Sequence, residues 1–197
     1  MSTLALNIDM CDRLTVVVGG GKVALRKVHA LLAAGSAIRL IALEVCQEIA
    51  ELAASGKISV RLGSYGATDL DKAFLIVAAT DDAAVNQAVA SDAIERGMLV
   101  SVADSPLSGN CTFPALLRRG NLEIAVSTGG RCPTLATEVR DVIADIIGEE
   151  YGVILEQLAA AREKLLTDGS PSTYNTQVLR SLAGQLISEL TERKDPA

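Results

Sequence analysis

The first half of the chain alternates short apolar runs with amphipathic stretches. Apolar residues recur at helical spacing in three stretches, which predict a helix that starts at Lys22 and helices over Cys46–Ser55 and Val85–Arg96. Asp81 or Asp82 can cap the third of these helices. Repeated strand–helix units of this length predict an α/β protein with a parallel, doubly wound sheet. The apolar runs that predict its strands are Leu14–Val18, Ile38–Ala42, Ile58–Leu62, Phe74–Ala78 and Leu99–Ala103.

This alternation ends after Asp104. Strand-like stretches near Thr112–Leu117 and Leu122–Ser127 precede a helix that opens at Thr128–Pro133 and runs to about Ile147. We therefore expect a sheet domain over 1–113, a small α+β segment over 114–150 and a helical C-terminal region over 151–197. Two apolar stripes predict the helices of that last region, Ile154, Leu155, Leu158, Leu165 and Leu166, then Val178, Leu182, Leu186 and Leu190.

The first predicted strand ends in a glycine turn that opens a helix. Gly19, Gly21 and Ala24 fit the pattern G-x-G-x-x-A, the alanine-ended form of the dinucleotide fingerprint. Gly19 permits the tight turn, Gly21 lets the backbone approach a pyrophosphate, and the helix N-terminus offers N–H groups to an anion. A glycine-rich turn without a ligand is the alternative, but the strand before and the helix after favour a Rossmann-type, dinucleotide-binding sheet.

Composition narrows the remaining classes. The 197 residues are 49% hydrophobic and 3% aromatic, typical of buried parallel strands, and the net charge of −6 argues against nucleic-acid binding. We expect no membrane span, because no apolar run is long enough, and a cytoplasmic location, because no signal peptide is evident. Four cysteines without a C-x-x-C pair and a single histidine, His29, predict no metal site.

The other predicted strand ends supply further cofactor candidates. Lys22 and Val23 would line the pyrophosphate turn, and Leu43 and Glu44 would border the adenosine. Glu44 either reaches a ribose hydroxyl or occupies the first turn of the next helix, where the dipole favours an acid. Because no arginine follows that strand to hold a 2′-phosphate, the cofactor is expected to be NAD. Thr80 either contacts ribose or caps the following helix together with Asp81.

Asp104 follows the fifth apolar run and precedes a proline turn. This places it at the carboxyl edge of the predicted sheet, where ligands bind in open α/β proteins. A carboxylate beside a nicotinamide can accept the proton that is lost when a substrate gives up hydride. The alternative is that Asp104 only caps the turn at Ser105–Pro106, and position by itself does not separate the two interpretations.

Several segments, in order, resemble the precorrin-2 dehydrogenases of siroheme synthesis, the family that includes the N-terminal module of siroheme synthase. The resemblance covers residues 4–147, and as a set its motifs are far more specific than the glycine turn. They are Gly-Gly-Gly-Lys-Val-Ala-Leu-Arg-Lys (19–27), Ala-Ala-Thr-Asp-Asp-Ala-Ala-Val-Asn (78–86), Val-Ala-Asp-Ser-Pro (102–106), Phe-Pro-Ala (113–115), Arg-Gly-Asn-Leu-Glu-Ile-Ala-Val-Ser-Thr-Gly-Gly (119–130) and Pro-Thr-Leu-Ala (133–136).

The resemblance implies an NAD-dependent oxidation of precorrin-2 to sirohydrochlorin, with the family's essential aspartate at Asp104. In some members the same site then inserts Fe²⁺, which would make iron a substrate and not a cofactor. It also implies a homodimer that exchanges the segment after Phe113 and a helical region that covers the active-site cleft. The chain departs from many members in the stretch Leu-Ser-Gly-Asn-Cys-Thr (107–112), at Cys132 in place of serine, and at Thr128.

A polycarboxylate substrate on an acidic protein requires local positive charge. Arg118, Arg119 and Arg131 are candidates, although Arg118 is also typical of solvated surface charge. A turn of backbone N–H groups before a helix, made by Ser127, Thr128, Gly129 and Gly130, would form an anion cradle together with Arg131. Two other hypotheses remain at this point: an NAD-sensing regulatory module without catalysis, and a different NAD oxidoreductase on the same fold.

Overall fold

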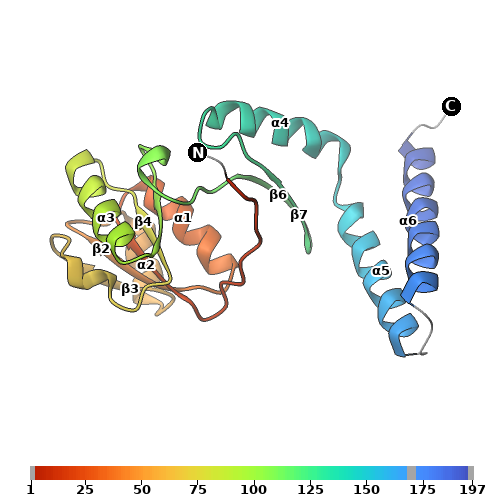
Figure 1. Cartoon of the computed structure of the whole chain (residues 1–197), viewed down its shortest axis with the longest axis horizontal. Helices are drawn as coiled ribbons and strands as arrows, with labels where there is room; N and C mark the ends of the chain where they lie inside the picture. The colour runs from red at the N-terminus through yellow and green to blue at the C-terminus, as the bar shows by residue number, and fades with distance from the viewer. Residues whose placement is uncertain (1–2, 168–171, 195–197) are drawn as a thin grey trace. The chain divides into compact units, whose positions relative to one another are not determined.

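The computed structural model describes residues 3–167 and 172–194, and the chain divides into two compact units between Phe113 and Pro114. The first unit is built on a parallel sheet in the order β3-β2-β1-β4-β5, which confirms the predicted α/β class. Figure 1 shows this sheet with the helices that flank it. Its strands are β1 (Leu14–Val18), β2 (Ala37–Ala42), β3 (Ser59–Leu62), β4 (Leu75–Ala78) and β5 (Leu99–Val102).

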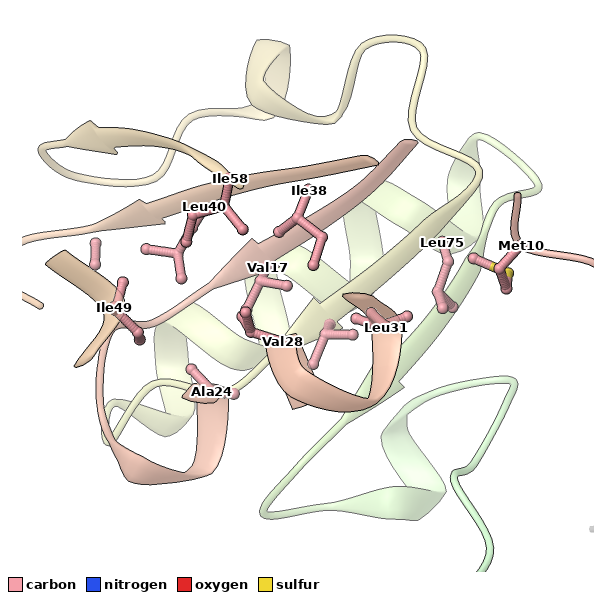
Figure 2. Close-up of a cluster of buried hydrophobic side chains, with 13 residues drawn as sticks. Met10, Val17, Ala24, Val28, Leu31, Ile38, Leu40, Ile49, Ile58 and Leu75 are labelled. Atoms are coloured by element: carbon pink, nitrogen blue, oxygen red, sulfur yellow. The ribbon is translucent and has the colours of Figure 1, made fainter. Parts of the chain in front are cut away.

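Apolar side chains cover both faces of this sheet because neighbouring residues of a strand point to opposite sides. On one face Val17 and Leu40 pack against α1 (Lys22–Ala33) and α2 (Gln47–Ala54), as Figure 2 shows for Val28, Leu31 and Ile49. On the other face lie α3 (Ala83–Glu95) and the short 3₁₀ helix η1 (Ala67–Leu70). The sheet side chains on this face are Val16, Val18, Ile76 and Val100. They form one buried cluster with Leu70 of η1 and with Val89, Ala90 and Ala93 of α3.

The second unit begins with an antiparallel hairpin, β6 (Ala115–Arg119) and β7 (Leu122–Val126). It continues into three helices, α4 (Pro133–Ile146), α5 (Glu150–Thr167) and α6 (Ser172–Lys194). Among the residues whose side chains are described, its buried apolar ones are Leu117, Ala136 and Ile154. The small α+β segment and the C-terminal helices therefore follow the prediction, while the functions expected of these parts stay predictions.

The structure refines several predicted boundaries. The strand expected from Thr112 begins only at Ala115, since Pro114 has no N–H to give to a ladder. Asp82 caps α3 without Asp81, because the Asp82 carboxylate accepts from the N–H groups of Ala84 and Val85. Across residues 3–167 and 172–194, no helix combines the length and hydropathy needed to span a bilayer.

Candidate functional site

Four strand ends meet at the carboxyl edge of the sheet in the first unit. Gly19 follows β1, Leu43 follows β2, Thr80 lies just after β4 and Asp104 just after β5. The strands are parallel and paired in register, so these positions share one edge. The chain builds outward from β1 through β2 and β3, then returns to the other side of β1 with β4 and β5. The point where strand order reverses, between β1 and β4, is where such sheets bind ligands.

The glycine turn sits at this point, and its first two glycines are required by close packing. Gly19 has φ +122°, and a Cβ there would lie 2.3 Å from the carbonyl oxygen of Ala79. A Cβ on Gly20 would lie 2.1 Å from the carbonyl oxygen of Glu44, and the Gly20 carbonyl accepts from the Cys46 N–H at 2.9 Å. The turn is therefore locked against the loops that follow β2 and β4.

Gly21 differs from its neighbours, because a Cβ on it would meet nothing within 4 Å. It is the N-cap of α1, and no side chain caps the helix there. The N-terminus of α1 therefore has no side-chain cap and open space beside Gly21, which suits the pyrophosphate of a dinucleotide. Lys22 and Val23 are the exposed first residues of this helix, so this chain's own residues fit the cofactor.

Leu43 and Glu44 are both exposed and lie beside the glycine turn, since their loop packs its backbone on Gly20. A bound adenosine would reach this loop from the turn. Glu44 lies two residues before Cys46, the N-cap of α2, and the acid in the first turn of this helix is Glu48. The alternative that Glu44 occupies the first turn of this helix is therefore wrong, and its contact with ribose stays a prediction.

Asn86, which sequence reasoning gave no role, connects Thr80 to Asp104. Its amide oxygen accepts from the Thr80 hydroxyl at 2.7 Å and from the Thr80 N–H at 3.1 Å. Its NH₂ group donates to the Thr80 carbonyl and to Asp104 Oδ1, each at 3.0 Å. The sequence does contain a signal for Asn86. It shares the buried face of α3 with Val89, Ala90 and Ala93, and it is the polar residue on that otherwise apolar face.

The loop that carries Asp104 is also tied to β5. Asn110 accepts from the Val100 N–H and donates to the Met98 carbonyl, both at 2.8 Å, as a neighbouring strand would. The hydroxyls of Ser105 and Ser108 lie 2.8 Å apart across a 3₁₀ turn, η2 (Pro106–Ser108). Asp104 itself is exposed at the edge, so its carboxylate is accessible while its backbone is held.

The predicted anion cradle forms the turn between β7 and α4 in the second unit. Gly129 and Gly130 have φ of +62° and +77°. Much of the turn's hydrogen-bonding capacity is used internally: Gly129 N–H donates to Ser127 Oγ, Cys132 N–H to Thr128 Oγ1, and Arg131 N–H to the Thr128 carbonyl. An anion here would therefore depend chiefly on the exposed Arg131 side chain and the α4 dipole.

The other two candidate arginines have structural partners. Arg118 pairs across the hairpin with Glu123 at 2.6 Å, in keeping with surface charge. Arg119 donates to the carbonyl oxygens of Ile147 and Ala144 and pairs with Glu149, so it caps the end of α4. A helix C-terminus thus engages the Arg119 guanidinium, and its expected role toward a substrate stays a prediction.

Metal-ligating side chains are dispersed over the described part of the chain. Within residues 3–167 and 172–194, no cluster of three or more His, Cys, Asp or Glu side chains could hold a metal ion. His29 is exposed on α1. Its position is that of a surface residue.

Comparison with known proteins points to one family. Residues 6–115 match a family model described as "Putative NAD(P)-binding". The solved structure of SirC, a precorrin-2 dehydrogenase, superposes with a TM-score of 0.74 and 31% identity, covering 94% of this chain and 100% of that one. Siroheme synthase of Chromobacterium violaceum is 44% identical over 137 residues, which are 70% of this chain and 29% of that protein.

Siroheme synthase of Methylococcus capsulatus is 41% identical over 165 residues, or 84% of this chain and 35% of that protein. The chain thus spans about a third of the length of the curated relatives it matches, but the whole length of the solved one. The family model, over residues 6–115, includes the glycine turn and all five strands of the parallel sheet.

Proposed function

The chain belongs to the precorrin-2 dehydrogenase family of NAD(P)-binding proteins, and we propose that it oxidises precorrin-2 to sirohydrochlorin with NAD as hydride acceptor. One observation carries the proposal. Asp104 and the open glycine turn share the carboxyl edge of one sheet, and Asp104 is held there by Asn86. A nucleotide sensor would need the turn but not a fixed, exposed carboxylate beside it.

The reaction removes two hydrogens from the tetrapyrrole, one as a hydride and one as a proton. Bound NAD supplies the nicotinamide that accepts one of them as hydride. The other leaves as a proton, and the Asp104 carboxylate takes it as general base. Products are sirohydrochlorin, NADH and a proton that Asp104 passes to solvent, which it can reach because its side chain is exposed.

Recognition of the polycarboxylate substrate falls to the turn before α4. Arg131 is exposed, and α4 begins two residues later. A guanidinium and a helix N-terminus both favour carboxylate groups. Ser127, Thr128, Gly129 and Gly130 form this turn, and we assign them to substrate binding together with Arg131.

The test is NADH formation from precorrin-2 and NAD by the wild-type chain and by Asp104→Ala. We expect turnover in the wild type and a loss of about a hundredfold or more in the variant, with NAD affinity unchanged. NAD binding by the wild type without any turnover would contradict the proposal and favour a regulatory module. Turnover that survives in Asp104→Ala would keep the dehydrogenase but remove Asp104 from its chemistry.

We also propose that the chain forms a homodimer through α4. Leu135, Val139, Val142 and Ile146 recur every three or four residues, so they form one stripe on this helix. These side chains are between 39% and 63% exposed, although all four are large and apolar. A continuous apolar helix face is commonly buried by a partner, and a second copy offers the same stripe.

Light scattering on Val142→Glu tests the dimer. We expect the molar mass to fall from twice that of the chain toward that of a monomer, because a charge in the stripe cannot be buried unpaired. Asp141→Lys changes charge on a neighbouring side of the same helix and should leave the dimer intact. A wild-type chain that is monomeric at micromolar concentration would overturn the proposal.

A further inference from the structure

Asn86 is a buried polar side chain on a helix face that is otherwise apolar. It is 1% exposed, and the other buried residues of α3 are Val89, Ala90 and Ala93. An amide in such a place costs free energy unless every polar atom finds a partner. Here both the oxygen and the NH₂ group are satisfied, with all partners on the loops that follow β4 and β5.

The orientation of this amide is fixed by its surroundings. The Thr80 backbone N–H can only donate, and it lies 3.1 Å from the Asn86 oxygen, so that oxygen must be the atom facing it. The NH₂ group accordingly points at the Thr80 carbonyl and at Asp104 Oδ1. In the flipped amide, the NH₂ group would face the Thr80 N–H, which is also a donor. The amide oxygen would then face Asp104 Oδ1, which is also an acceptor.

We propose that Asn86 is a positioning residue for the reaction: it fixes the Asp104 carboxylate so that Oδ1 is engaged and Oδ2 is the oxygen that receives the substrate proton. This inference rests on the proposed dehydrogenase function. Because its side chain is buried, Asn86 acts through Asp104. Asn110, on the other side of the same loop, holds the backbone, so the carboxylate orientation depends on Asn86.

Geometry is the reason that such a contact affects rate. A carboxylate at an exposed strand end rotates freely about its side-chain torsions unless a bond holds it. The bond from Asn86 comes from α3, a helix packed on the sheet, and the same amide is fastened to Thr80. Displacement of a reacting group by about 1 Å can lower the rate about a hundredfold.

The experiment measures kcat, KM for precorrin-2 and the NAD dissociation constant in wild type, Asn86→Ala, Asp104→Ala and the double variant. We expect Asn86→Ala to lower kcat by about ten- to a hundredfold with both affinities within about twofold. In the Asp104→Ala background the same substitution should have no further effect on kcat, because Asn86 then has no carboxylate to orient.

Two further variants keep the test decisive if Asn86→Ala folds poorly. Asn86→Asp has the same size and still accepts from Thr80, but it no longer donates to Asp104, so kcat should fall as in Asn86→Ala. Asn121→Ala is the matched control. Its amide donates to the Glu156 carboxylate at 2.8 Å on the surface of the second unit, and kcat should not change.

The outcomes separate this inference from the proposed function. Asn86→Ala could lower kcat by the same factor in the Asp104→Ala background as in the wild type, and this result would overturn the positioning role. A loss of NAD affinity without a loss of kcat would overturn it as well. Both results leave the dehydrogenase standing. Absence of turnover in the wild type would overturn both proposals, since Asp104 would then have no substrate proton to receive.

Discussion

The ammonium nitrogen of Lys27 lies 4.1 Å from the centre of the Phe113 ring, over the last residue of the first unit. Lys27 is on α1 and half-buried, and Phe113 packs against the core that α1 covers. Burial is the main cause that lowers the Lys27 pKa, with Arg26 adding repulsion. The ring face offers this desolvated cation a favourable electrostatic partner.

This pair should be energetically coupled. In a double-mutant cycle of Lys27→Met and Phe113→Leu, we expect a coupling free energy of about 0.5–1 kcal/mol in urea unfolding. Both substitutions keep apolar volume, so the cycle isolates the cation–ring contact from packing. Lys27→Arg should retain most of the coupling. Additive effects of the two substitutions would show that the contact contributes nothing.

Alkylation of cysteines should depend on position and pH. Burial raises the pKa of the Cys111 thiol to about 11, although the nearby Lys27 charge opposes the shift. Since the thiolate is the nucleophile, iodoacetamide at pH 8 should modify Cys111 far more slowly than the exposed Cys132, as read by peptide mass spectrometry. Lys27→Met should slow Cys111 further. Equal labelling of both thiols at pH 8 would contradict this account.

The same two groups give the fold opposite pH dependences in alkaline solution. Folded Cys111 keeps its proton up to about pH 11, whereas an unfolded thiol loses it near 9.0, so this contribution to stability is lost between those values. Lys27 has a lowered pKa, so the folded state releases its proton first and stability rises with pH there. As the pH rises from 8 to 11, the unfolding midpoint of Lys27→Met should therefore fall more steeply than that of the wild type.

The glycine turn offers a matched pair of variants. Gly19→Ala should destabilise the first unit by more than about 2 kcal/mol, because of its φ of +122° and the Ala79 carbonyl 2.3 Å from a Cβ. Gly21→Ala meets open space and should keep nearly wild-type stability while NAD affinity falls at least about tenfold. Thermal unfolding and NAD calorimetry measure the two effects. Unchanged NAD affinity in Gly21→Ala would place the pyrophosphate elsewhere.

Glu44 can be distinguished from a simple helix-dipole partner. If its carboxylate holds ribose, Glu44→Gln should weaken NAD by about tenfold and reduce discrimination against NADP, whose 2′-phosphate a carboxylate repels. Glu48→Gln is the control, because Glu48 lies in the first turn of α2 and shares the dipole. Equal effects of both substitutions on stability, with no change in the NAD-to-NADP ratio, would support the dipole role.

Local sequence chemistry was enough for much of the fold. The period of the apolar residues identified β1, α1 and the strands and helices that follow, since each element buries one face or both. The glycine spacing located the turn between β1 and α1, and the position of Asp104 after an apolar run placed it at a strand end. These features depend on residues that are close together along the chain, so the sequence pattern alone predicts them.

Contacts between distant residues were decided by the tertiary structure. Asn86 and Asp104 are 18 positions apart, and they meet because β4 and β5 are adjacent in the sheet. Arg119 resembled a substrate-binding charge, yet folding places the end of α4 against its guanidinium. Sequence by itself determined the elements, the turn and the position of Asp104 at a strand end. Which side chains hold that carboxylate depended on strand order, because pairing brings together groups whose separation along the chain carries no signal.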